Sequence, residues 1–193
     1  KEIINASEMN LPQPLLGIIP KKVEGNLKQN LSLKAVSIHR QIYPKQLSIN
    51  ILERVPIAYA QRAISSGIEN GVIDKNAQWI PFNWLERDHK KLAISVEGWD
   101  LSNRKLISFI LSHRNNLGSP LQKITLNSNG EVILKTAQFN SIILGTNTDL
   151  INQQINVLSH LGNFSPKDLV NEPSKSLDLR DPSKPQLQTL KPQ

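Results

Sequence analysis

The 193-residue chain has no cysteine, few aromatic residues and no long apolar run. Without cysteine it can form no disulfide, no thiolate nucleophile and no thiolate metal site. Its apolar runs are only a few residues long, whereas a membrane-spanning helix needs about 20 apolar residues. The chain begins with Lys1 and Glu2, with neither an initiator Met nor a signal peptide. We therefore expect it to be a piece of a longer protein and to contain no spanning helix itself.

Acidic residues are outnumbered, with 23 Lys and Arg against 16 Asp and Glu and a net charge of +7. Such a charge suits an anionic partner, for example nucleic acid or a lipid surface. The basic residues, however, are scattered, with no run longer than two. Aromatic residues make up only 5% of the chain, too few for a platform on which bases could stack. The sequence therefore predicts no nucleic-acid partner.

Motifs for catalysis are also missing. The four histidines show no paired ligand spacing for zinc, and the chain has neither a nucleophile elbow nor a glycine-rich phosphate loop. The neighbouring charges Glu53 and Arg54, and Asp178 and Arg180, are best interpreted as structural ion pairs. We predict no catalytic residue, metal site, cofactor or small-molecule substrate, and no enzyme activity.

The first quarter of the chain has the pattern of two helices and a hairpin. Residues 2–9 form the end of one helix, and Pro20 suits the first turn of a second. The second helix carries an apolar stripe at spacings of four, and from residue 33 the apolar period changes to two. We predict that one face of the hairpin packs on this stripe. The stripe consists of Val23, Leu27 and Leu31, and the hairpin face of Leu47, Ile49 and Ile51.

The rest of the chain alternates short strands, turns and two helices. The predicted helices cover residues 102–116 and 148–160, the second capped by Thr148. Strands are predicted at 57–63, 72–73, 78–82, 92–96, 121–126, 131–136, 141–144 and 175–180, with turns at 65–67, 69–71 and 129–130. The fold class is α+β, a small helix-and-hairpin module followed by a larger mixed β-sheet domain with two helices. We place the boundary near residues 54–56.

Several segments together resemble a known family. Residues 36–40 (VSIHR), 43–44 (YP), 47–49 (LSI) and 53–58 (ERVPIA) occur in the order V-x-x-x-R-x-x-x-P-x-x-L-x-I-x-x-x-E-R-x-P-x-A. This order is similar to the POTRA hairpin of the bacterial cell-division family FtsQ/DivIB.

Further segments continue the resemblance. Residues 71–79 (GVIDKNAQW) are similar to the family's V-D-x-x-G-x-x-F hairpin, with Asn76 at the glycine position. Residues 142–145 (IILG) and 177–180 (LDLR) resemble its closing elements, and residues 12–16 (PQPLL) look most like its cyanobacterial branch.

The resemblance implies a partial POTRA-like domain at 1–54, without its first strand, and an FtsQ-type β domain at 55–180. Residues 181–193 would be an edge strand or a disordered tail. It also implies a single-pass protein of the plasma membrane at the division site, with an anchor upstream and this region extracytoplasmic (periplasmic). Its role would be a non-enzymatic divisome scaffold that binds FtsB/DivIC-like and FtsL-like subunits.

In that family the strand after the Asp-Leu-Arg motif is the edge onto which FtsB adds a strand. The corresponding partner-binding residues here are Arg180, Asp181, Ser183, Lys184, Leu187 and Thr189. This segment also contains Pro182 and Pro185, and it lacks the aromatic residue and glycine of better-known members.

Two other functions remain open at this point. A POTRA-containing outer-membrane assembly factor would carry several tandem POTRA modules and a membrane barrel. A basic polyanion-binding module would show a contiguous basic groove.

Overall fold

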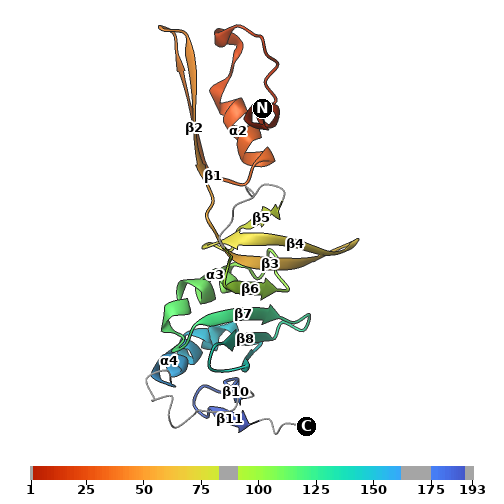
Figure 1. Cartoon of the computed structure of the whole chain (residues 1–193), viewed down its shortest axis with the longest axis vertical. Helices are drawn as coiled ribbons and strands as arrows, with labels where there is room; N and C mark the ends of the chain where they lie inside the picture. Colours follow the sequence, from red (N-terminus) through yellow and green to blue (C-terminus); the bar gives the residue numbers. More distant parts are fainter. Residues whose placement is uncertain (1, 83–90, 162–174, 190–193) are drawn as a thin grey trace. The chain divides into compact units, whose positions relative to one another are not determined.

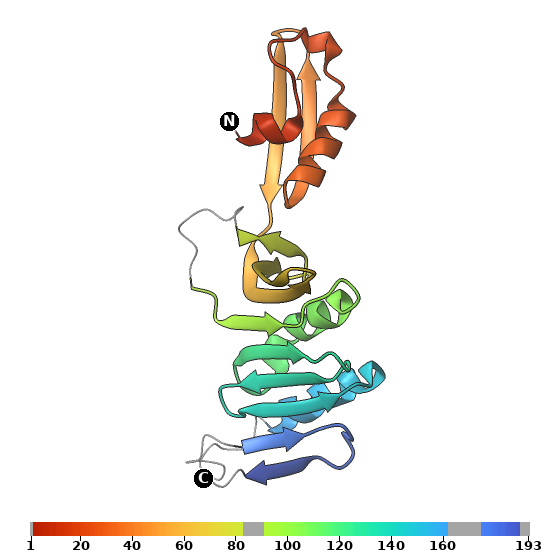
Figure 2. The same cartoon turned by 90° about the vertical axis from the view of Figure 1, so that its right-hand side faces the viewer.

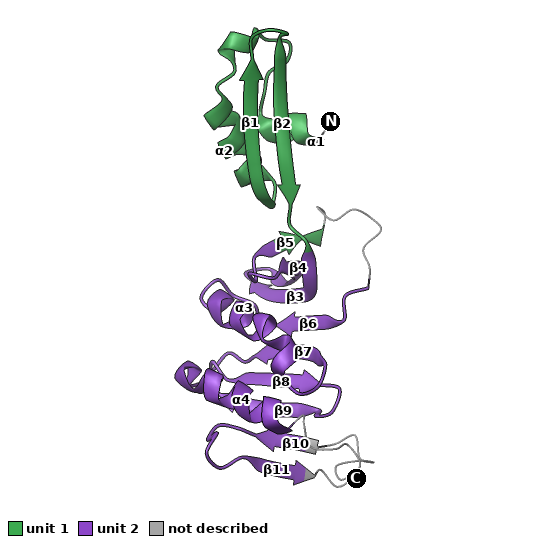
Figure 3. Ribbon diagram, turned by 90° about the vertical axis from the view of Figure 1, so that its left-hand side faces the viewer, with its two compact units in different colours: residues 1–55, 80–86 green, residues 56–79, 87–193 purple. Residues whose placement is uncertain are grey.

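The computed structural model describes residues 2–82, 91–161 and 175–189. The chain divides into two compact units, residues 1–55 with 80–86, and residues 56–79 with 87–193 (Figure 3). None of the helices in the described ranges is both long and apolar enough to cross a bilayer.

The first unit combines helices with a two-stranded antiparallel sheet (Figure 1). Its elements are α1 (Glu2–Ser7), the short 3-10 helix η1 (Leu15–Gly17), α2 (Pro20–Asn30), β1 (Leu33–Gln41) and β2 (Gln46–Glu53). Pro20 occupies the first turn of α2, as predicted, because that position needs no N–H donor. The α+β class, with two helices and then a hairpin, is confirmed for this unit.

The predicted packing of the hairpin on α2 is confirmed for two of its three residues. The buried cluster consists of Ile18, Val23, Leu27 and Val36, and Leu47 and Ile49 pack against it half-buried. Ile38 on β1 pairs with Ile49 on β2 and contacts the same cluster.

Polar side chains fasten the remaining segments to this core. Arg40, the arginine of the first motif, donates through Nη1 to the carbonyl oxygens of Leu16 and Ile18, both at 3.2 Å. It thereby holds the loop before α2 against the end of β1. The amide of Asn30 donates to the carbonyl of Ala6 at 2.9 Å, which ties α1 to α2.

The second unit is built around a large mixed sheet with the strand order β11-β10-β9-β8-β7-β6-β3-β4-β5, although residues 80–81 of β5 are grouped with the first unit. Its elements are β3 (Pro56–Ile64), β4 (Gly67–Asp74), β5 (Trp79–Pro81), β6 (Ile94–Glu97), α3 (Arg104–Ser112), η3 (Arg114–Asn116), β7 (Leu121–Leu126), β8 (Val132–Thr136), β9 (Ser141–Gly145), η4 (Thr148–Leu150), α4 (Ile151–Leu161), β10 (Lys175–Asp178) and β11 (Gln186–Thr189). Both α3 and α4 lie on the same face of this sheet (Figure 3).

The core of the second unit lies between that face and the two helices. Alternate strand residues are buried there, for example Ile124 on β7 and Leu134 on β8. They meet the apolar stripes of the helices, which include Ile107 of α3 and Leu158 of α4. This arrangement explains why the strands alternate in burial while the helices follow a helical period.

One predicted turn and one predicted helix cap differ from the structure. Residues 69–71 are not a turn but part of β4, where Asn70 pairs with Gln61 and Gly71 pairs with Ala60 of β3. Pairing along the whole of β3 outweighs the local turn preference of Asn-Gly. The second helix is capped by Asn147 rather than Thr148, because the Asn147 side chain accepts a hydrogen bond from the N–H of Asp149.

A third difference concerns the turn between β4 and β5. The positive φ falls on Ala77, at 53°, and not on Asn76. The Asp74 carboxylate accepts hydrogen bonds from the N–H groups of Asn76 and Gln78, both at 2.9 Å, and so wraps the turn around Ala77. The residue that takes the left-handed conformation in this turn is therefore Ala77.

Candidate partner-binding edge

The predicted partner-binding segment forms a turn and then a strand at one edge of the large sheet (Figure 2). The last predicted strand, 175–180, ends two residues earlier, with β10 at Lys175–Asp178. It runs parallel to β9 and antiparallel to β11. Residues 190–193 lie outside the described residues. Where the sequence left open a strand or a tail, the structure has the strand β11, Gln186–Thr189.

Leu187 brings an apolar side chain to this edge. It pairs directly with Leu177 of β10, so both side chains lie on the same face of the sheet. Leu177 is 3% exposed and belongs to the core, whereas Leu187 is 47% exposed. The core of the second unit therefore ends in a half-open apolar position at β11.

Asp181 and Ser183 shape the turn that joins β10 to β11. One carboxylate oxygen of Asp181 accepts hydrogen bonds from the N–H and the hydroxyl of Ser183, at 3.0 and 2.6 Å. The Asp181 carbonyl also accepts from the N–H of Lys184. These Ser183 bonds lower the pKa of Asp181 below its ordinary value. Both side chains thus have an internal role as an Asx turn.

Arg180 is paired with Asp178, which confirms the ion pair predicted from the sequence. Its guanidinium donates through Nε and Nη2 to both oxygens of that carboxylate. This hydrogen bonding lowers the pKa of Asp178 and raises the pKa of Arg180. The stem of Arg180 lies over Gly145 of β9, where a Cβ would come within 2.9 Å of the Arg180 Cγ.

Lys184 and Thr189 lie in the turn and at the end of the strand, respectively. Lys184 is exposed in the turn. Thr189 pairs with Lys175 at the end of the ladder, and its side chain lies outside the described residues. Pro182 and Pro185 both fall in the turn, before β11 begins, so neither removes a donor from the ladder.

Gln154 of α4 is a residue that the sequence analysis missed. It is fully buried, and its amide donates to the carbonyls of Leu144 and Leu179, both at 2.8 Å. It therefore joins the end of β9 to the segment that follows β10. Its signal in the sequence is a polar residue at a position of the apolar stripe of the predicted helix 148–160.

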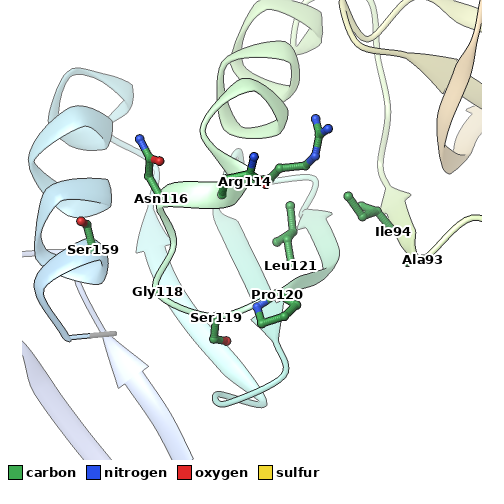
Figure 4. Close-up of a pocket in the computed structure, with 10 residues that line it drawn as sticks. Ala93, Ile94, Arg114, Asn116, Gly118, Ser119, Pro120, Leu121 and Ser159 are labelled. Atoms are coloured by element: carbon green, nitrogen blue, oxygen red, sulfur yellow. The ribbon is translucent and has the colours of Figure 1, made fainter. Parts of the chain in front are cut away.

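A cavity of about 630 Å³ lies elsewhere in the second unit, near the end of α3 (Figure 4). Its lining includes Ile94, Leu121, Asn116, Ser119 and Ser159. A cation in its wall, Arg114, donates to the carbonyl of Leu111 at the end of α3. Among the described residues that line it there is no acid or histidine. Across the described part of the chain, no three His, Asp or Glu residues are grouped as metal ligands.

Residues 1–54 match the family model described as "POTRA domain, FtsQ-type". This match supports an FtsQ/DivIB-like family and a role in cell division. It covers the first quarter of the chain and does not bear on the cyanobacterial branch, which stays a prediction. No curated protein matches the chain.

Proposed function

We propose that the chain is the extracytoplasmic, periplasmic region of a non-enzymatic divisome scaffold of the FtsQ/DivIB type. The observation that carries this proposal is the FtsQ-type POTRA match over residues 1–54. In the proposal, an anchor upstream of Lys1 holds the protein in the plasma membrane at the division site. The same match favours this role over an outer-membrane assembly factor, because the matched POTRA model is of the FtsQ type.

Within that role, the β11 edge receives a strand from an FtsB/DivIC-like subunit, with an FtsL-like subunit beside it. An edge strand offers main-chain N–H and C=O groups to an incoming segment, and alternate side chains select the partner. Leu187 supports this role, because its half-open side chain continues the core and would be buried by an added strand.

The charged residues divide into two groups under this proposal. Arg180 presents a guanidinium already held by Asp178, and Lys184 is an exposed cation, so both suit an acidic coiled-coil end. Asp181 and Ser183 act on the partner indirectly, by fixing the turn that positions β11. Thr189 would contact the incoming strand at the end of β11.

The test is calorimetric binding of the cognate FtsB-like segment to the chain and to a variant lacking residues 181–193. We expect the deletion to abolish binding while circular dichroism still reports a folded sheet. Unchanged affinity with an intact sheet would exclude this edge as the binding site.

A matched pair of substitutions sharpens the test. Leu187→Asp places a charge at the half-open apolar position and should weaken binding by about 1–3 kcal/mol. Gln188→Asp adds the same charge one residue along, on the opposite face of the strand, and should leave the affinity nearly unchanged. Equal losses from both variants would show that Leu187 is not the apolar contact.

A further inference from the structure

Exposed apolar side chains gather with lysines at one end of the first unit. They come from the η1 loop and the β1–β2 turn, which lie at the same end of this unit, and from the start of α2, which follows the η1 loop partway along the hairpin (Figures 1 and 2). Hydrogen bonds from Arg40 to the carbonyls of Leu16 and Ile18 join the loop to the hairpin there. We call this set the basic apolar tip: Leu16, Ile19, Lys21, Lys22, Ile42, Tyr43 and Lys45.

The apolar members of the tip are unusually open to solvent. Tyr43 is 90% exposed, Leu16 72% and Ile42 69%. They project from turns and loops, beyond the cluster around Leu27 that forms the core of this unit. Folding of the unit therefore gains little from them.

The charge of the tip is of one sign. The two segments that build it, residues 9–23 and 39–47, contain four Lys or Arg residues and no acid. Lys21 and Lys22 stand in the first turn of α2, where the helix dipole disfavours cations. Helix stability consequently does not account for these lysines.

We propose that the basic apolar tip binds directly to an anionic lipid surface. Aliphatic and tyrosine side chains enter the headgroup region, where a tyrosine ring places its body in the apolar layer and its hydroxyl in water. Lysines around them pair with lipid phosphates, and their stems reach along the interface. Because the two segments contain no acid, an anionic surface would not be repelled by them. The exposed side chains of the turns can enter a lipid interface because lipids rearrange around them.

This contact is separate from the β11 edge and does not depend on it. It also differs from an upstream anchor, because it would fix the orientation of the first unit at the membrane surface. The 193-residue chain is thus expected to bind vesicles by itself.

The experiment is cosedimentation of the 193-residue chain with phosphatidylcholine vesicles, with and without phosphatidylglycerol. We expect binding to the vesicles that contain phosphatidylglycerol and much weaker binding to the neutral ones. Replacing Lys21, Lys22 and Lys45 by Gln should lower the partition coefficient about a hundredfold, at about fivefold for each lysine. Lys34→Gln, an exposed lysine at the opposite end of β1, is the matched control and should change it little.

A second pair of variants tests insertion of the apolar side chains. The double variant Ile42→Ser with Tyr43→Ser should lower vesicle binding about tenfold. Ile68→Ser is the matched control, because Ile68 is 71% exposed in the second unit. All these side chains are exposed, so the thermal melting of each variant should stay close to that of the parent chain.

The proposal would be overturned if the parent chain did not bind vesicles that contain phosphatidylglycerol. It would also fall if the serine variants bound like the parent, since charge alone would then explain the attraction. A third contrary outcome is a dimer in sedimentation equilibrium that the serine substitutions dissolve, which would make the tip a contact between two copies.

Discussion

Two glycines with similar backbone conformations differ in what surrounds them. Gly98 has φ of +74° and Gly130 has φ of +83°, a region that side chains disfavour. A Cβ at Gly98 would lie 2.1 Å from the carbonyl oxygen of Leu126, whereas one at Gly130 would meet nothing within 4 Å.

Alanine substitutions should separate these two effects. Gly130→Ala should cost about 1 kcal/mol of unfolding free energy, from the backbone alone. Gly98→Ala should cost about 3 kcal/mol or more, because the carbonyl of Leu126 must also move. Urea denaturation measures both values. Similar losses would mean that the strand at Leu126 yields freely to the added methyl group.

The ion pair at the end of β10 predicts a dependence on pH. The hydrogen bonds from Arg180 lower the pKa of Asp178 in the folded chain. The resulting stabilisation is fully present above the ordinary aspartate pKa of about 3.9 and is lost as the pH falls through the lowered value. In Arg180→Gln we expect the Asp178 pKa to rise toward its ordinary value and the acid-dependent loss of stability to shrink. Carboxyl NMR titration checks this, and the same pKa in both chains would contradict it.

At this scale the sequence predicts contacts between neighbours better than backbone angles. The Asp178–Arg180 pair follows from two opposite charges two residues apart, on one face of the predicted strand 175–180. The positive φ at Ala77 did not follow, because it depends on how the Asp74 carboxylate wraps the turn. The role of Gln154 depends on two carbonyls that are distant from it in the sequence, at 144 and 179.

Among the elements, the contact of α2 with the hairpin makes the most direct prediction. Leu27 is fully buried in this contact, whereas Ile49 is half-buried against it. Leu27→Ala should therefore cost about 3 kcal/mol and Ile49→Ala about 1–2 kcal/mol. Ile42→Ala, on the exposed turn, should stay within about 0.5 kcal/mol. Denaturant melts give all three values, and a loss below half a kcal/mol at Ile49 would mean that the face does not pack on α2.

Elements with strong local patterns were predicted well. The alternating residues 121–126 match β7 to the residue, and the Asn-Gly turn after them joins β7 to β8. Elements that depend on a neighbouring strand were not: the Asn-Gly at 70–71 has the same turn preference but lies inside β4, paired with β3. Composition cannot separate these two Asn-Gly pairs, because the difference lies in the pairing partner.

For the whole molecule, the two buried clusters share no residue among those described. A substitution in one cluster is therefore expected to spare the other. Leu27→Ala should weaken amide hydrogen-exchange protection in α2, β1 and β2, while α3 and β7 keep theirs. Mass-spectrometric exchange on the parent and variant chains measures this. Matching losses in both units would mean that they unfold as one cooperative body.

The strand order of the large sheet has a consequence for synthesis. The last described strand in the chain, β11, lies at the outer edge and reaches the sheet only through β10, which itself pairs with β9 across the α4 connection. A chain interrupted before residue 175 would end its sheet at β9 and leave Ile142 and Leu144 beside an open ladder. Only a product that has been synthesised through β11 can therefore present this edge strand to a partner.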